Sequence, residues 1–280
     1  MQILKSPGAA ASYSRAVACL LLVAWSIPGR AAQDAHDQGK TDSGCDGRTT
    51  GLLSDAKCYV TAPLRWDGED WVYFGGALVA VGVAHHYDSD VRDHFTRGSN
   101  LPSSDSSSSD MQDALPAAGI FAATWLYATV TNDHDGRTES WTMIEAAGFS
   151  SATSYLLKFA AGRERPDVTG DPNDWRSGGD SFPSMHTSAA FAIGTVFAES
   201  GNDRYRWVRR VVGYGMAAYT GYARLDHNAH WLSDTVAGAA IGISTAHYIL
   251  RRHYGPNAGG QFAWVPLERG GMLTYSLVLR

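Results

Sequence analysis

The stretch DSFPSMHTSAAFAIGT, residues 180–195, indicates a helix that begins at a defined cap and is built from small and apolar residues. Pro183 and Ser184 stop the preceding chain, and a serine in this position can cap a helix through its hydroxyl group. The backbone N–H groups of Met185 and His186 would then point out of the helix N-terminus, an arrangement that favours anions. The histidine is either incidental to the cap or a proton donor beside an anion site.

Five other segments have the length of helices, and none shows the sustained alternation of a strand. They cover residues 70–88, 115–133, 140–162, 204–225 and 230–252. Their many small residues indicate close packing. We therefore predict an all-α fold, a compact helical bundle of about six core helices. The segments QFAWVPL and MLTYSLVLR flank ERGG near the C-terminus and predict a short β-hairpin.

Length and composition favour one main domain with appendages. The chain has 280 residues, of which 44% are hydrophobic and 18% charged, an ordinary globular composition. We expect a signal peptide over 1–32, an irregular segment over 33–69, the main domain over 70–252 and a tail with the hairpin over 253–280. The Ser/Asp-rich stretch 99–113 is interpreted as a mobile surface loop. A net charge of −5 gives no basic footprint, so we expect no nucleic-acid partner.

The N-terminus has the pattern of a secretory signal peptide. Lys5 and Arg15 precede the apolar run AVACLLLVAWSI, residues 16–27, and small residues follow near Ala31 and Ala32. We therefore predict an exported, periplasmic protein, with an uncleaved N-terminal anchor as the alternative.

Two cysteines, Cys45 and Cys58, remain after such a cleavage, with twelve residues between them. In an oxidising compartment this pair is predicted to form a disulfide, and two separate thiols are the alternative. The predicted helices have apolar cores of only about 13–16 residues, whereas a membrane-spanning helix needs about 20. This favours a soluble bundle, but membrane embedding stays an alternative because helices rich in small residues also suit bilayers.

Two further segments place charged residues inside apolar surroundings. In KFAAGRERP, residues 158–166, Lys158 and Arg165 are seven positions apart and therefore share one helix face. In ARLDHNAHWLSD, residues 223–234, Asp234 follows His230 by four positions. A carboxylate there can hold one imidazole N–H and leave the other nitrogen available as a nucleophile. Each segment alone is more often structural than catalytic.

Taken together, the three segments resemble the type 2 phosphatidic acid phosphatase superfamily, which also includes bacterial acid phosphatases and vanadium haloperoxidases. The matching residues occur in the family's order over roughly residues 70–250: Lys158, Arg165 and Pro166, then Pro183, Ser184 and His186, then Arg224, His230 and Asp234. Two positions depart from the family pattern. Met185 stands where the family usually has glycine, and Ala223 where it usually has serine. Both departures put rate and substrate range in question.

The resemblance implies a phosphatase that hydrolyses a phosphomonoester or pyrophosphate, with a lipid-linked substrate as one option, through a phosphohistidine intermediate. His230 would be the nucleophile, Asp234 would orient it, and His186 would be the general acid. The phosphate would be bound by Lys158, Arg165, Ser184, the backbone at Met185, and Arg224. No metal or cofactor is implied, because the cationic cluster itself stabilises the transition state. The phosphorylated substrate would be the partner, with membrane-surface association as an option.

Several other hypotheses about the function and the site residues stay open. The resemblance also allows a non-catalytic phosphate or lipid binder, or a vanadate-dependent haloperoxidase. His86, Asp90 and His94 recur at helical spacing and could bind a metal, although a solvated helix end is favoured. His227 either faces the rim of the site or is an incidental loop residue.

Overall fold

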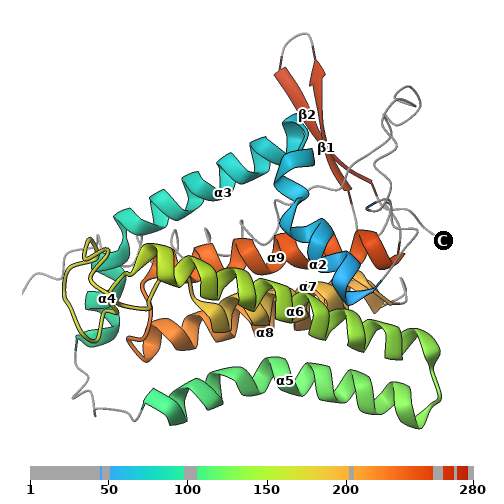
Figure 1. Cartoon of the computed structure of the whole chain (residues 1–280), viewed down its shortest axis with the longest axis horizontal. Coiled ribbons are helices and arrows are strands. Elements are labelled where there is room, and N and C mark those ends of the chain that lie inside the picture. The colour runs from blue at the N-terminus through green and yellow to red at the C-terminus, as the bar shows by residue number, and fades with distance from the viewer. Residues whose placement is uncertain are drawn as a thin grey trace, which may run out of the picture.

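The computed structural model describes residues 45, 51–97, 106–201, 205–254, 261–267 and 270–276. The predicted signal peptide, residues 1–32, lies outside these residues. The helices in the described part of the chain are shown in Figure 1. Their bounds are α2 (Leu52–Val60), the 3-10 helix η1 (Ala62–Arg65), α3 (Gly68–His86), α4 (Asp88–Thr96), α5 (Ser106–Val130), α6 (His134–Ala161), α7 (Met185–Glu199), α8 (Arg206–Asp226) and α9 (Leu232–Tyr254).

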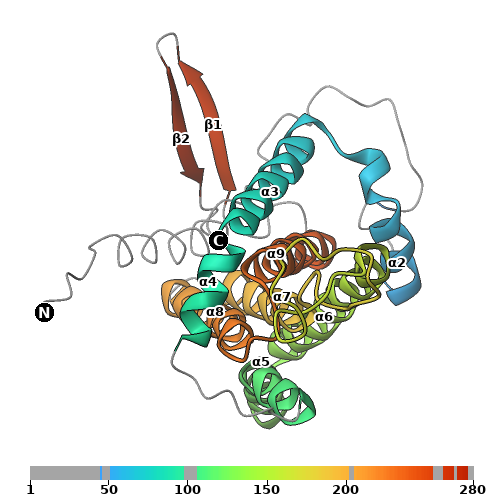
Figure 2. The same ribbon diagram turned by 90° about the vertical axis from the view of Figure 1, so that its left-hand side faces the viewer.

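Helix α7 lies in the middle of the bundle and packs against α5, α6, α8 and α9 (Figure 2). It can occupy this place because small and apolar residues cover it on all sides, so that Ala190, Phe191, Ala192 and Val196 are all buried. A helix that is apolar all round belongs inside a protein. The segment that follows the Ser184 cap is therefore the central helix of the fold.

Glycines set how closely the helices approach α7. A Cβ atom added at Gly194 would lie 2.5 Å from the carbonyl oxygen of Gly213 on α8, and one at Gly213 would lie 2.5 Å from that of Gly194. A Cβ atom at Gly242 of α9 would lie 2.2 Å from the carbonyl oxygen of Ser188. Real Cβ atoms do not approach backbone this closely, so α8 and α9 can contact α7 only because these positions carry no side chain.

Helix ends are fixed by side chains and by one left-handed residue. The Asp67 and Asp70 carboxylates form a capping box at the start of α3, and Asp133 caps α6. Gly162 ends α6 with φ 54°, a backbone conformation that suits glycine. The chain then turns into the loop 162–184, which runs to the start of α7 (yellow in Figure 1).

The predicted fold class needs correction. The bundle is all-α, but the described residues form eight α-helices rather than about six, because segments 52–60 and 88–96 are also helical. The strands β1 (Gln261–Leu267) and β2 (Gly270–Ser276) pair antiparallel with each other and stand outside the bundle (Figures 1 and 2). The predicted β-hairpin therefore does not belong to the packed body of the fold, which is helical throughout.

The interpretation of residues 99–113 as a mobile loop is also wrong in part. Helix α5 already begins at Ser106, nine positions before the predicted start at 115, and it accommodates Pro116 in its interior. Asp113 is buried, so this polar stretch does contribute a contact to the core side of the bundle. The serine-rich composition of this stretch gave no indication that Asp113 binds Arg224, which lies far along the chain.

A disulfide joins Cys45 to Cys58 on α2, the pair that the sequence predicted. A loop of this length stabilises a folded chain by about 3 kcal/mol, through the entropy that it removes from the unfolded state. Asp55 of α2 is buried against Arg252 near the end of α9, so this disulfide-linked segment is attached to the bundle. Within the described part of the chain, no helix has both the length and the apolar character that crossing a membrane requires.

Candidate active site

Four helix ends meet at one end of the bundle. They are the C-terminal ends of α6 and α8 and the N-terminal ends of α7 and α9, and the loop 162–184 lies beside them (Figure 1). The residues singled out in the sequence lie on these ends or on the adjoining loops. The positive charges of Arg224, Lys158, Arg165 and His186 all act on His230. Folding therefore brings the three sequence segments together.

His230 and Asp234 form the centre of this cluster. Nδ1 of His230 lies 3.5 Å from Oδ2 of Asp234, and both side chains are buried. Burial lowers the pKa of His230 well below its usual value, and the cations Arg224 and Lys158 lower it further. The imidazole is therefore neutral at neutral pH. A neutral ring has one unprotonated nitrogen, which is the form that a nucleophile requires.

Asp234 is held by several donors besides its approach to His230. The Trp231 backbone N–H donates to Oδ2 at 2.9 Å, and the Ser181 hydroxyl donates to the same oxygen. Arg163 donates to Oδ1 at 2.6 Å. Burial raises the pKa of Asp234, and the Arg163 guanidinium and these hydrogen bonds oppose the rise.

Each of the three predicted phosphate-binding cations is held by an oxygen of the chain. Lys158 donates to the backbone carbonyl of Asp180, and burial lowers the pKa of Lys158 to about 8. Arg165 donates to both carboxylate oxygens of Asp180, at 2.7 and 2.9 Å. Arg224 is fully buried and donates to Asp113 at 2.8 Å.

The start of α7 is fixed by its own cap and by α9. Ser184 is the N-cap, and its hydroxyl accepts from the Thr187 backbone N–H. The Ser184 backbone N–H donates to the Asp234 carbonyl at 3.0 Å, which ties the start of α7 to α9. Met185 and His186, in the first turn, are half-buried. The helix N-terminus thus faces the same region as the cations.

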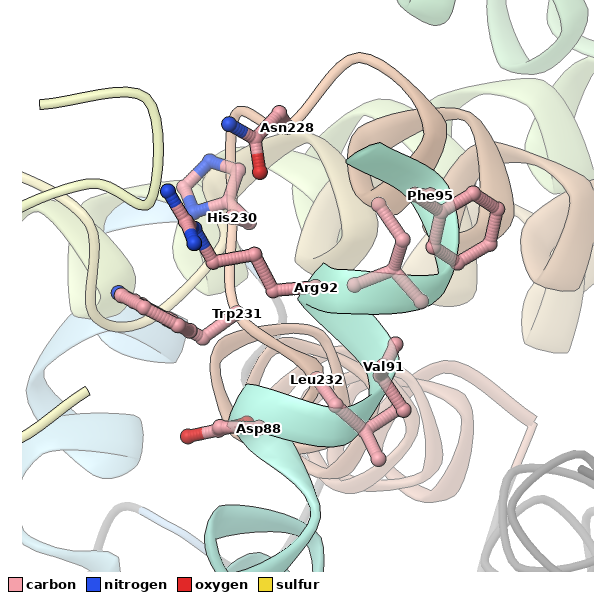
Figure 3. Close-up of a pocket in the computed structure, with 9 residues that line it drawn as sticks. Asp88, Val91, Arg92, Phe95, Asn228, His230, Trp231 and Leu232 are labelled. Atoms are coloured by element: carbon pink, nitrogen blue, oxygen red, sulfur yellow. The ribbon is translucent and has the colours of Figure 1, made fainter. Parts of the chain in front are cut away.

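His230 also lines a small pocket beside α4. Figure 3 shows the pocket with His230, Asn228 and Trp231 on the turn between α8 and α9 and with Arg92 on α4. Arg92 donates to the carbonyl oxygen of Pro166 at 3.1 Å, which attaches α4 to the loop that carries Arg165. His230 therefore borders α4 as well as the cationic cluster.

The structure also shows the surroundings of His227 and of the histidines considered as metal ligands. His227 lies at the end of α8, and its Nδ1 is 3.2 Å from Oδ2 of Asp113, so it belongs to the edge of the cluster. His86, Asp90 and His94 are all exposed. They lie on α3 and α4 at the surface, as a solvated helix end would.

Sequence reasoning missed four residues that contact the predicted site residues, and a fifth, Asp88, that contacts one of those four. Asp113 and Asp180 hold two of the arginines, Ser181 and Arg163 hold Asp234, and Asp88 holds Arg163. Arg163 and Ser181 were visible, because they lie within the quoted segments and neighbour the matched residues. No sequence pattern indicated a role for Asp88 or Asp113, because their partners are more than 70 positions away in the chain.

Comparison with known proteins agrees with this arrangement. The sequence profile of the PAP2 superfamily matches residues 139–257. The lipid A 1-phosphatase of Porphyromonas gingivalis is 36% identical over 115 residues, which are 39% of this chain and 24% of that protein. The lipid A 1-phosphatase of Rhizobium johnstonii is 37% identical over 101 residues, 34% of this chain and 39% of that protein.

A more distant relative is a PA-phosphatase related-family protein of Dictyostelium discoideum, 27% identical over 139 residues, which are 44% of this chain and 51% of that protein. The chain thus spans about a quarter to a half of the length of these curated relatives. No solved structure matches the chain significantly.

Proposed function

Residues 139–257 belong to the PAP2 superfamily, and from this premise we propose that the chain is a phosphatase, a phosphoric ester hydrolase acting on a phosphomonoester or a pyrophosphate. The observation that carries the proposal is the buried His230–Asp234 pair, which lies among the charges of Lys158, Arg165 and Arg224. A neutral imidazole among cations suits attack on an anionic phosphoryl group, because the cations offset its charge.

The proposed reaction has two steps. In the first, Nε2 of His230 attacks phosphorus, the N–P bond forms, and the bond from phosphorus to the leaving oxygen breaks as His186 donates a proton to that oxygen. In the second, neutral His186 accepts a proton from water, the water oxygen attacks phosphorus, and the N–P bond breaks. The products are inorganic phosphate and the leaving group, which is an alcohol for a phosphomonoester and a phosphate for a pyrophosphate, and His186 ends in its starting protonation state.

The cationic side chains have distinct parts in this proposal. Arg165 and Arg224 carry planar guanidinium groups, which match the geometry of phosphate oxygens. Lys158 adds a compact charge, and the first turn of α7 after Ser184 offers backbone N–H groups. Together these groups would stabilise the charge on the transferring phosphoryl group, so the proposed mechanism requires no metal ion.

A lipid phosphate is the substrate class that we propose. Three relatives are named lipid A 1-phosphatase, and the outer surface of this chain suits contact with lipid. Large apolar side chains are exposed on α3, α5, α6 and α8, among them Trp71, Leu78, Trp125, Leu126, Trp141, Phe159, Trp207 and Val211. Such extensive apolar exposure is unusual for a protein surrounded only by water. We infer that these faces associate with a membrane surface.

We also propose that the protein is exported. The Cys45–Cys58 disulfide supports this proposal, because structural disulfides persist in oxidising compartments such as the bacterial periplasm. Mass spectrometry of the protein purified from cell envelopes tests it. The expected mature chain begins near residue 32 and carries the disulfide, and an intact chain with two free thiols contradicts the proposal.

Phosphate release in the presence of EDTA tests the proposed activity. The purified protein is assayed with p-nitrophenyl phosphate and with a lipid phosphate in detergent micelles, beside its His230→Ala variant. We expect phosphate release from both substrates by the unmodified protein alone. Release that EDTA abolishes contradicts the metal-independent mechanism. Binding of phosphate without any release indicates the non-catalytic binder instead.

A further inference from the structure

Arg163 is a fully buried cation beside the site, and it is not among the predicted phosphate-binding residues. It follows Gly162, whose left-handed conformation ends α6, and its side chain is 0% exposed. Its guanidinium carbon lies 4.5 Å from the ring centre of Trp175 and 5.2 Å from that of Trp231. Flat contacts of this kind suit a guanidinium and not an ammonium group.

The hydrogen bonds of Arg163 connect two buried carboxylates. Nη1 donates to Oδ1 of Asp234 at 2.6 Å and to the Ser233 hydroxyl at 2.8 Å. Nη2 donates to Oδ2 of Asp88 at 2.7 Å and to the Pro172 carbonyl at 2.7 Å. The planar fork therefore fixes Asp88 and Asp234 on either side of one guanidinium.

Asp88 is in turn attached to the start of α9. It is the first residue of α4 and is fully buried. The Ser233 backbone N–H donates to Oδ1 of Asp88 at 2.8 Å, and the Ser233 hydroxyl donates to Oδ2 at 2.7 Å. Asp88 thus holds both Arg163 and the residue that directly precedes Asp234.

We propose that Arg163, anchored by Asp88, is a positioning residue that orients the Asp234 carboxylate toward His230. With Oδ1 bound to Arg163, the carboxylate presents Oδ2 to the imidazole Nδ1 at 3.5 Å. This inference rests on the proposed function, in which Asp234 acts on the attacking histidine. Neither Arg163 nor Asp88 touches the reacting atoms in this scheme.

Charge supports the same role. Asp88, Arg163 and Asp234 together carry one net negative charge when all are ionised, and all three are buried. When Nε2 of His230 binds phosphorus, the ring becomes cationic, and its Nδ1 lies 3.5 Å from Oδ2 of Asp234 in this negative group. Arg163 also opposes the burial that raises the pKa of Asp234, so its loss would favour the neutral carboxyl.

Kinetics of two conservative variants test the proposal. Arg163→Lys keeps a charge but loses the fork, and Asp88→Asn keeps the shape but loses the charge. With p-nitrophenyl phosphate, we expect kcat to fall about 10- to 100-fold in each variant while KM changes less than about threefold. The matched control is Arg252→Lys, which alters another buried arginine–aspartate pair at the far end of α9 and should leave kcat unchanged.

A double-mutant cycle separates positioning from general damage. If Arg163 acts through Asp234, Arg163→Lys costs little further activity in an Asp234→Asn background. An equal loss in both backgrounds overturns the proposal, as does a raised KM with normal kcat. So does a fall in kcat that is no larger than that of Arg252→Lys.

Imidazole nitrogen NMR provides a readout that does not depend on activity. In the unmodified protein we expect His230 as a single tautomer, protonated at Nδ1, and a mixture of tautomers in Arg163→Lys and Asp88→Asn. The same spectrum in all three proteins overturns the positioning role. An inactive unmodified protein that shows the expected spectra contradicts the proposed function but supports the role of Arg163.

Discussion

Two arginine–aspartate pairs, formed by arginines two positions apart in the chain, differ sharply in their surroundings. The Arg163–Asp234 pair has an N–O distance of 2.6 Å, and both side chains are 0% exposed. The Arg165–Asp180 pair has nearly the same distance, 2.7 Å, but its side chains are 21% and 62% exposed. The first pair lies behind His230, and the second lies at the open side of the cationic cluster.

The difference shows that contact distance alone does not give the function of an ion pair. Removing one member of a buried pair leaves an uncompensated charge and costs about 3–5 kcal/mol. An exposed pair contributes about 0–1 kcal/mol, because water readily replaces either partner. The buried pair is therefore suited to fixing a geometry, and the exposed pair is suited to opening when an anionic substrate arrives.

The largest expected effect lies where the two regions meet, at His230. Because His230→Ala removes the proposed attacking atom, we expect kcat to fall by at least about 10⁴-fold, with the melting temperature little changed. Asp234→Asn should cost less, since the nucleophile remains. Steady-state phosphate release and thermal unfolding measure both effects. A folded His230→Ala protein with near-normal activity contradicts the assignment.

A smaller and substrate-dependent effect is expected on the open side, at His186. A general acid matters most when the leaving group is a poor one, so His186→Ala should slow alkyl phosphates by about 10²- to 10⁴-fold. The variant should slow p-nitrophenyl phosphate far less, because nitrophenolate leaves without a proton. The ratio of kcat/KM for the two substrates measures this. Equal losses on both argue against an acid role.

The pH dependence of phosphate binding should reveal Lys158. Its pKa is lowered to about 8 by burial, so the side chain is cationic below that pH and neutral above it. We therefore expect inhibition by inorganic phosphate to weaken as the pH rises through 8. Lys158→Arg should remove this alkaline limb, because arginine stays charged throughout. A limb that persists unchanged in the variant must come from another group.

The smallest expected effect tests the exposed pair directly. Asp180 engages two N–H groups of Arg165 that a phosphate could otherwise use, so Asp180→Asn should lower the inhibition constant for phosphate by a few fold, the change expected of an exposed pair. Titration of inorganic phosphate against p-nitrophenyl phosphate turnover measures the change. Weaker phosphate inhibition in Asp180→Asn would mean that Asp180 orients Arg165 and does not compete with the substrate.

The sequence predicted the cationic cluster that contains Arg165, but not the buried contacts around Arg163. Lys158, Arg165 and His230 could be chosen as candidate site residues because they occur in short, ordered motifs. The helix ends and loops that carry these motifs do come together in the fold. Helices were likewise predictable, since small apolar residues recur along each. The predicted helix starts were wrong mainly for α5, where serine-rich composition resembled a loop.

The buried side could not be predicted because its contacts join distant parts of the chain. Asp113 of α5 meets Arg224 of α8, and Asp88 of α4 meets Arg163 after α6. Nothing local distinguishes such an aspartate from a solvated one until the helices pack. Arg163 is the exception, because it lies inside a matched motif, two positions before Arg165.

The mutual contact of Gly194 and Gly213 has a consequence for evolution and for screening. The two glycines lie about 15 Å along their helices from Ser184 and Arg224 respectively, at a rise of about 1.5 Å per residue. A single methyl group at either position would wedge α7 and α8 apart and carry Arg224 away from the other cations. Random mutagenesis should therefore recover loss-of-function alleles at Gly194 and Gly213. Such alleles leave every catalytic residue unchanged and lie far from the site. A second mutation to a smaller residue cannot restore the contact, because both positions are already glycine.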